Sequence, residues 1–245
     1  MSQPKTLVII PTYNERENLP AIADALMKLS VRVEMLVVDD NSPDGTGQLA
    51  DDLAAKEPRI HVLHRQQKQG LGRAYLAGFK WALERDYEFI MEMDGDFSHS
   101  PNDIPRFLET MEREHADLAV GSRYSNGIRV INWPLRRLML SMSAAKYVRI
   151  ITGMPISDPT GGFKCFRRRA LQALDLDAVH SNGYSFQIEL THKLWRRGFR
   201  VAEVPIIFTD RLQGTSKMSR KIVWEALFMV WRLWAQHGFR RWPAV

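Results

Sequence analysis

The chain has 245 residues, of which 45% are hydrophobic and 25% charged, and its formal net charge is +6. This length allows one large domain, or a domain with an appendage, and the composition excludes disordered and fibrous proteins. The single cysteine, Cys165, cannot form an internal disulfide, and no Cys/His spacing typical of a zinc site occurs in the sequence. We recognise no signal peptide before the first strand-like run, so we expect a protein of a reducing compartment.

The two halves of the sequence carry net charges of opposite sign. Residues 1–122 carry 13 Lys and Arg against 21 Asp and Glu, a net charge of −8, whereas residues 123–245 carry 21 against 7, a net charge of +14. An acidic half can hold ligands that bind through a cation, and a basic half favours phosphate, nucleic acid or an anionic membrane. Two solvated faces of unequal charge are the alternative explanation.

The first half alternates strand and helix patterns. Short aliphatic runs, typical of buried parallel strands, occur at Thr6–Ile10, Val33–Val38, Ile60–Leu63, Glu88–Met93 and Leu118–Val120. Helical patterns lie between them, at Glu15–Leu29, Thr46–Lys56, Gly72–Glu84 and Pro101–Glu114. We expect Asn14 to cap the first helix and Pro101 to begin the last one. The alternation predicts an α/β fold with a mostly parallel central sheet and helices on both faces.

The second half is less regular. Strands are predicted at Phe163–Phe166 and Val201–Ile207, and helices at Leu135–Ile151, Phe186–Arg197 and Met218–Gln236. The sequence contains no internal repeat, low-complexity tract or linker composition. We therefore expect one domain with a C-terminal elaboration.

Three loops that follow predicted strands are acidic or polar, namely Pro11–Glu15, Asp39–Thr46 and Asp94–Ser98. Ligands of parallel α/β sheets bind beyond the carboxyl ends of the strands, so these loops should lie together. Two carboxylates separated by one residue suit Mg²⁺ or Mn²⁺ shared with substrate phosphates. Each loop alone is also ordinary turn chemistry. The Gly70–Ala74 segment is either a phosphate-binding glycine loop or a tight turn that packs closely into the next helix.

Taken in order, these motifs resemble those of the inverting glycosyltransferases of family 2, and most closely the dolichol- or polyprenol-phosphate mannosyltransferases. In the first half the matching segments are Ile10–Glu15, Val38–Thr46, Gly70–Ala74, Met93–His99 and Gly121–Tyr124. In the second half they are Asp158–Phe163, Gly183–Glu189, Glu203–Ile206 and Asp210–Lys217. The resemblance covers nearly the whole chain and implies a Rossmann-like GT-A fold.

The resemblance also implies a donor site. Pro11, Tyr13 and Glu15 would hold the nucleotide base and ribose, and Val38 and Asp40 would complete that pocket. Asp94, Gly95 and Asp96 occupy the Asp-x-Asp motif of the family, with Asp96 as a ligand of Mg²⁺ or Mn²⁺ beside the diphosphate. Ser98 holds a position that contributes to the metal shell in some relatives.

Basic residues complete the implied site. Arg123, Arg211 and Lys217 match cations around the nucleotide diphosphate, and Arg137 with Ser141 matches an acceptor-phosphate site. Asp94, Asp96 and Arg123 are the expected catalytic residues. An acceptor phosphate is already an anionic nucleophile near neutral pH, since its second pKa is about 6, so no strong general base is required.

The resemblance implies transfer of mannose from GDP-mannose to a polyprenyl phosphate, with inversion at the anomeric carbon. One alternative keeps the fold but uses UDP-glucose or another UDP-sugar. A second is a non-catalytic module that binds phosphate or nucleic acid, suggested by the basic half. We expect no nucleic-acid partner, because no such motif occurs and acidic loops would repel a polyanion.

The C-terminal part carries two adjacent apolar stripes. The first is Ile222, Ala226, Val230 and Leu233, and the second is Trp224, Phe228, Trp231 and Ala235. The run is too short for a membrane span, which needs about 20 residues, but a broad Trp-rich face suits a membrane interface. Packing in the core or against another subunit is the alternative, and the oligomeric state is left open.

We expect a catalytic domain at 1–217, divided into a nucleotide-sugar half (1–122) and an acceptor half (123–217), and an amphipathic tail at 218–245. The protein would attach peripherally to the cytoplasmic face of a membrane.

Overall fold

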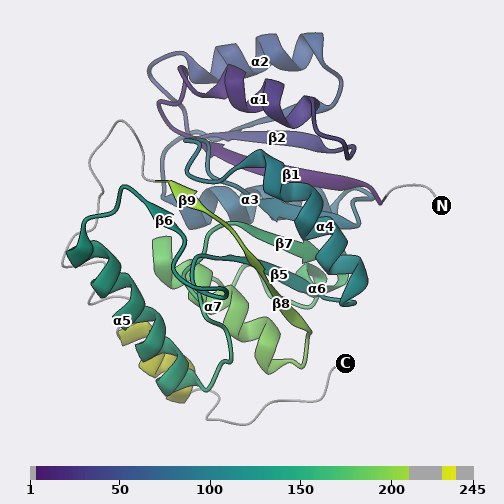
Figure 1. Cartoon of the computed structure of the whole chain (residues 1–245). Coiled ribbons are helices and arrows are strands. Elements are labelled where there is room, and N and C mark those ends of the chain that lie inside the picture. The colour runs from purple at the N-terminus through teal and green to yellow at the C-terminus, as the bar shows by residue number, and fades with distance from the viewer. Residues whose placement is uncertain (1–3, 210–227, 236–245) are drawn as a thin grey trace.

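A seven-stranded sheet lies at the centre of the molecule, between two layers of helices (Figure 1). The computed structural model describes residues 4–209 and 228–235. The first-half elements are β1 (Thr6–Thr12), α1 (Leu19–Met27), β2 (Glu34–Asp39), α2 (Thr46–Lys56), β3 (Ile60–His64), α3 (Leu71–Leu83), β4 (Phe89–Glu92), the 3₁₀ helix η1 (Pro101–Asp103), α4 (Ile104–Arg113) and β5 (Leu118–Ser122). The second-half elements are β6 (Val130–Ile131), α5 (Leu135–Thr152), β7 (Lys164–Arg167), α6 (Arg168–Gln172), α7 (Gly183–Arg196), β8 (Val201–Pro205) and β9 (Phe208–Thr209).

The strand order in the sheet is β3-β2-β1-β4-β7-β5-β8. Strands β1 to β4 pair in parallel, and so do β5 and β8, whereas β7 is antiparallel to both of its neighbours, β4 and β5. The prediction of a mostly parallel sheet is confirmed. Because β7 comes from the second half of the chain and inserts between two strands of the first, the acidic and basic halves share one sheet.

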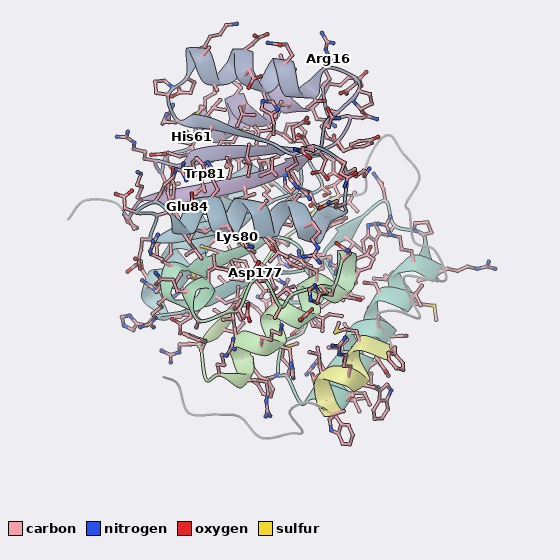
Figure 2. The ribbon with its side chains drawn as sticks, turned by 180° about the vertical axis from the view of Figure 1, so that it is seen from behind. Arg16, His61, Lys80, Trp81, Glu84 and Asp177 are labelled. Atoms are coloured by element: carbon pink, nitrogen blue, oxygen red, sulfur yellow. The ribbon has the colours of Figure 1, made fainter. Side chains whose placement is uncertain are left out.

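Each face of the sheet has its own hydrophobic core. Helices α1, α2 and α4 cover one face, with Ile22 and Phe107 among the side chains that pack on it. Helices α3, α6 and α7 cover the other face, where Phe79 and Phe186 are fully buried. Figure 2 shows this second face, with Lys80 on α3 next to Asp177, and the two form an ion pair between α3 and the segment after α6.

The first helix begins later than predicted. Asn14 does not cap it, because Asn14 has a φ of +62° and the helix starts at Leu19 with Asn18 as its N-cap residue. The proline that follows Leu19 suits the first turn and fixes this start. Pro101 begins η1, as expected for a first-turn proline. The short helix α6 and the two-stranded sheet β6–β9 were not predicted, because both are too short to produce a periodic pattern.

Helix α5 and the helical residues 228–235 lie side by side at the edge of the molecule (Figures 1 and 2). Val230 and Leu233 are buried in a cluster with Val148 of α5 and Ile188 of α7. Phe228 and Trp231, from the second predicted stripe, are 78% and 49% exposed. One stripe therefore packs on the protein and the other faces outward. Ala235 of the second stripe is also exposed, and Ile222, Trp224 and Ala226 lie outside the described part of the chain. No described helix combines the length and the apolar character needed to cross a membrane.

Candidate active site

A cavity of about 550 Å³ opens where the strand-end loops meet the second half of the chain. The residues predicted from the sequence that line it are Pro11, Tyr13, Glu15, Asp40, Asp94, Gly95, Asp96, Arg123 and Arg137. The carboxyl ends of β1, β2 and β4 supply most of this set, as the rule for parallel sheets predicts. The acidic loops and the arginines of the basic half thus face one another across a single space.

Four predicted site residues do not line the described cavity. Val38 is fully buried in the core beneath the sheet end. The hydroxyl of Ser141, on α5, accepts a hydrogen bond from the Tyr124 hydroxyl at 2.7 Å. Arg211 and Lys217 lie outside the described residues.

The loops after β1 and β2 are held by a hydrogen-bond network. The Asp39 carboxylate accepts bonds from the hydroxyls of Thr12 at 2.8 Å and Ser42 at 2.6 Å. Arg65 pairs with Asp40 at 2.5 Å. Burial raises the pKa of Asp40, and the Arg65 cation opposes that shift. These bonds fix the backbone that presents the neighbouring aromatic side chain of Tyr13 to the cavity.

Tyr13 forms the outer wall of that end of the cavity. Its ring is 36% exposed and carries the Lys68 ammonium 3.6 Å above its centroid. Both side chains line the cavity. An aromatic face beside a cation suits a planar base joined to phosphates.

The Asp94–Asp96 loop follows β4. Asp94 accepts a hydrogen bond from the Tyr75 hydroxyl at 3.2 Å, and burial next to this carboxylate raises the pKa of Tyr75. Asp96 accepts bonds from the main-chain N–H of Ser98 at 3.0 Å and from its hydroxyl at 2.6 Å. Ser98 therefore orients Asp96 in this structure.

His99 closes the wall behind this loop. Its ring stacks on Phe163 with centroids 5.0 Å apart, and its Nδ1 accepts a bond from the Asp94 main-chain N–H at 3.3 Å. Burial lowers the pKa of His99, which favours the neutral imidazole. With Nδ1 as the acceptor, the ring proton lies on Nε2.

Arg123 follows β5 and is only 5% exposed. Its Nε and Nη2 donate to the two carboxylate oxygens of Asp158 at 2.6 and 2.7 Å, and Nη2 also donates to the Thr160 hydroxyl at 2.8 Å. Burial alone would raise the pKa of Asp158, but the Arg123 cation and its hydrogen bonds hold it below the usual range. The predicted phosphate-binding arginine is thus one half of a bidentate, buried ion pair.

Trp133 is a site residue that sequence reasoning missed. Its ring lies 4.2 Å from the Arg137 guanidinium carbon and 5.4 Å from that of Arg123, so one indole contacts both cations. Phe208 of β9 packs edge-on against it, with centroids 5.5 Å apart. A lone tryptophan before a helix carries no sequence signal for this role: Arg137 is only four residues away, but the contacts with Arg123 and Phe208 depend on the tertiary fold.

Two helices begin at the cavity. Gly70, with a φ of +101°, precedes α3, and a Cβ at Gly72 would lie 2.9 Å from the Ser181 carbonyl oxygen. The glycine segment is therefore a tight turn with close packing, although Gly70 and Leu71 also line the cavity. Asn182 and Gly183, at the start of α7, line it as well. Helix N-termini favour anions, so both elements add to the attraction of the arginines.

A buried polar group lies behind the floor of the cavity. Lys164 of β7 stands opposite Glu92 of β4, and both are fully buried. Burial raises the pKa of Glu92 to about 7 and lowers that of Lys164 to about 8. The Lys164 ammonium donates to the carbonyl oxygen of Gln187 at 2.8 Å and to its side-chain oxygen at 2.5 Å. Gln187 lines the cavity, so these contacts connect α7 to β7, the strand that pairs with β4 ahead of the Asp94 loop.

The described residues contain no group of three or more His, Cys, Asp or Glu side chains arranged to hold a metal ion. Asp94 and Asp96 nevertheless supply two carboxylates to the cavity. Magnesium-type cations are commonly held by one or two carboxylates together with substrate phosphates and water. The donor set fits a cation that binds together with a phosphate-bearing ligand, rather than a cation held by the protein alone.

The fold and this cavity define a GT-A-like glycosyltransferase: a mostly parallel sheet, an Asp-x-Asp loop at the end of a central strand, and arginines opposite it. The sequence model of glycosyl transferase family 2 matches residues 7–175, which is more than half of the chain. The chain belongs to glycosyl transferase family 2.

Two curated relatives are similar over nearly their whole length. The polyprenol monophosphomannose synthase of Mycolicibacterium smegmatis is 54% identical over 237 residues, covering 96% of this chain and 88% of that protein. The undecaprenyl-phosphate mannosyltransferase of Micrococcus luteus is 49% identical over 228 residues, covering 93% of each.

Solved structures share the fold at low sequence identity. Glucosyl-3-phosphoglycerate synthase from Mycobacterium tuberculosis, in complex with Mn²⁺, UDP-glucose and phosphoglyceric acid, matches with a TM-score of 0.70 and 16% identity over 99% of this chain and 88% of that one. The mannosyltransferase PcManGT from Pyrobaculum calidifontis, in complex with GDP-mannose and Mn²⁺, matches with a TM-score of 0.60 and 15% identity over 96% of this chain and 75% of that one.

Proposed function

We propose that this enzyme transfers mannose from GDP-mannose to a polyprenyl phosphate, with inversion at the anomeric carbon, giving a polyprenyl-phosphate β-mannose and GDP. The observation that carries the proposal is the single cavity in which the Asp94–Asp96 loop faces Arg123 and Arg137. The names of the two near-full-length relatives support mannose as the sugar and a polyprenyl phosphate as the acceptor.

The donor occupies the acidic end of the cavity in this proposal. Pro11, Tyr13 and Glu15 contact the base and ribose, with Asp40 behind them and Lys68 toward the phosphates. Arg211 and Lys217 remain candidates for the diphosphate on the motif resemblance alone. Val38 would contribute only through its main chain, because its side chain is buried.

A divalent cation, Mg²⁺ or Mn²⁺, would bind at Asp96 beside the diphosphate, with Asp94 next to it. When bound, it would neutralise the charge that develops on the departing nucleotide diphosphate. Ser98 holds Asp96 in place, and the Tyr75 hydroxyl does the same for Asp94. The Mn²⁺ in solved structures that share this fold supports a metal requirement.

The acceptor phosphate occupies the arginine end. Arg137 and Arg123 both contact the Trp133 ring, so we assign Arg123 to the acceptor phosphate rather than to the diphosphate. Ser141 lies one helical turn after Arg137, and its hydroxyl is held by Tyr124. Two fixed guanidinium groups offset the repulsion between an anionic nucleophile and an anionic donor. The monoester needs no protein base, because it is already largely dianionic at neutral pH.

The lipid chain must leave the cavity toward a membrane. Large apolar side chains are exposed along α5 and beside it, at Ile128, Ile131, Leu135, Met139, Leu140, Met142, Ile150, Ile207, Phe228 and Trp231. Exposed cations accompany them on α5, including Arg136 and Arg149. Such a surface suits the headgroup region of an anionic bilayer. We propose peripheral attachment there, at the cytoplasmic face.

Replacement of Arg137 tests the acceptor assignment. Arg137→Ala should raise the KM for polyprenyl phosphate at least tenfold and leave the KM for the sugar donor nearly unchanged, since one charge-assisted hydrogen bond is lost at one end of the cavity. Arg113→Ala is the control, because Arg113 is an exposed arginine of α4 rather than α5 and does not line the cavity. A defect confined to the donor would contradict the assignment.

A further inference from the structure

A second carboxylate lies behind the Arg123–Asp158 pair. Glu203 of β8 accepts hydrogen bonds from the main-chain N–H of Ser157, at 3.0 Å to each of its oxygens, and from that of Asp158 at 3.2 Å. These residues lie within the segment 153–163, which connects α5 to β7. Glu203 thus holds the backbone at the point where Asp158 projects toward Arg123.

The same segment packs tightly on the end of β5. A Cβ at Gly161 would lie 2.6 Å from the carbonyl oxygen of Gly121, so the two backbones are in direct contact. The Gly121 N–H in turn donates to the Phe163 carbonyl oxygen at 2.8 Å. Asp158 therefore has little freedom to follow Arg123 if the arginine shifts.

Arg123 is held from several directions. Its guanidinium has five N–H donors, and the bonds to Asp158 and Thr160 use only Nε and Nη2. Among the described residues, no hydrogen bond uses Nη1, and Arg123 lines the cavity. The rings of Trp133 and Phe208 lie 5.4 and 5.6 Å from the guanidinium carbon. The two Nη1 donors are therefore the ones available to a ligand in the cavity that Arg123 lines.

Stabilisation of the fold does not explain why this ion pair is buried. Asp158 is fully buried and Arg123 nearly so, and a buried ion pair is often no more stable than apolar residues of the same volume. A chain of two carboxylates behind one arginine, at the wall of a ligand cavity, is better explained by preorganisation of that arginine.

We propose that Glu203 is a positioning residue for the acceptor phosphate, acting through Asp158 to fix the Nη1 edge of Arg123 toward the cavity. The inference rests on the proposed function, because it takes the ligand of Arg123 to be a phosphate monoester. A guanidinium with one allowed orientation loses little conformational freedom when the anion binds, so binding is tighter than to a mobile side chain.

The test is Glu203→Gln, which keeps the shape of the side chain and one acceptor oxygen but removes its charge. We expect the KM for polyprenyl phosphate to rise about tenfold, while the KM for the sugar donor stays within a factor of two. Asp158→Asn should show the same split with a larger rise. Titration calorimetry with farnesyl phosphate, a short soluble monoester, should give the same loss of affinity without turnover.

Asp117→Asn is the matched control. Asp117 is also buried and accepts bonds from an arginine side chain, Arg169 at 2.6 Å, and from a main-chain N–H, that of Arg200 at 3.0 Å. It lies just before β5, at the end opposite Arg123, and does not line the cavity. The Asp117→Asn variant should lower the melting temperature as Glu203→Gln does, and should leave the KM for polyprenyl phosphate and the KM for the sugar donor unchanged.

A double-mutant cycle isolates the mechanism. In an Arg123→Gln background, Glu203→Gln should add no further rise in the KM for the acceptor, because its effect passes through the guanidinium. Additive effects, or a Glu203→Gln variant that differs from wild type only in melting temperature, would overturn the proposal. If the wild-type enzyme transfers no sugar to a polyprenyl phosphate and does not bind farnesyl phosphate, it is the proposed function that fails.

Discussion

At the residue scale, the site consists of charged groups whose positions are fixed by neighbouring charged or hydroxyl side chains. Arg65 holds Asp40, Ser98 holds Asp96, and Asp158 holds Arg123. Each ligand-facing side chain thus has a partner that does not need the ligand. Preorganised polar groups stabilise developing charge without reorganising during the reaction, which suits the separation of a nucleotide diphosphate from a sugar.

The buried Glu92 carboxyl predicts how the stability of the protein depends on pH. Burial raises the pKa of this carboxyl from its ordinary value of 4.5 to about 7 in the folded protein, so wild-type stability should fall as the pH rises from 5 to 8. Glu92→Gln does not titrate. The variant should therefore gain about 2 to 3 kcal/mol relative to wild type over that range, at about 1.4 kcal/mol per pKa unit. Loss of the carboxylate also favours neutral Lys164, which acts in the same direction.

Urea unfolding at pH 5 and pH 8 measures this difference. The exposed change Glu17→Gln is the control and should leave the pH dependence of the unfolding free energy as in wild type. A Glu92→Gln variant whose unfolding free energy follows wild type at both pH values would show that Glu92 is ionised throughout.

At the element scale, the sequence patterns predicted what local physics determines. Strands β1 to β5 are continuous aliphatic runs, and the parallel-sheet rule then gathers the loops after β1, β2 and β4 into one site. The start of α1 was predicted wrongly because the left-handed backbone at Asn14 depends on contacts with the next loop, such as the bond from its N–H to Ser42. The Arg123–Asp158 pair and the contacts of Trp133 with Arg123 and Phe208 also escaped prediction, since no local sequence pattern relates residues that meet only in the tertiary fold.

The exposed stripe on the 228–235 helix gives a prediction at the same scale. Trp231→Glu should weaken flotation with anionic liposomes several-fold at low salt, because it replaces interfacial apolar surface with a charge of the wrong sign. Ala21→Glu, an apolar-to-acidic change at another exposed position, on α1, is the control and should float as wild type does. Absence of liposome association by the wild-type protein at low salt would contradict the membrane proposal.

At the scale of the whole molecule, the fold brings the acidic half and the basic half of the chain to opposite sides of one cavity. The acidic half supplies the loops at the ends of β1, β2 and β4, and the basic half supplies Arg123 and Arg137 across the same cavity. Donor and acceptor are both anions, so a divided cavity lets each be bound by groups suited to it. The apolar surface of α5 and the 228–235 helix then lies on the basic half, where a lipid acceptor must enter.

The most direct test of the central claim is a transfer assay with purified enzyme, a polyprenyl phosphate, Mg²⁺ or Mn²⁺, and a panel of GDP- and UDP-sugars. We predict release of GDP from GDP-mannose, with formation of a polyprenyl-phosphate mannose and little turnover of the other donors. Chelation of the metal, or Asp96→Ala with the fold intact, should abolish that turnover. Preferential release of UDP, or turnover by Asp96→Ala in the presence of chelator, would contradict the account.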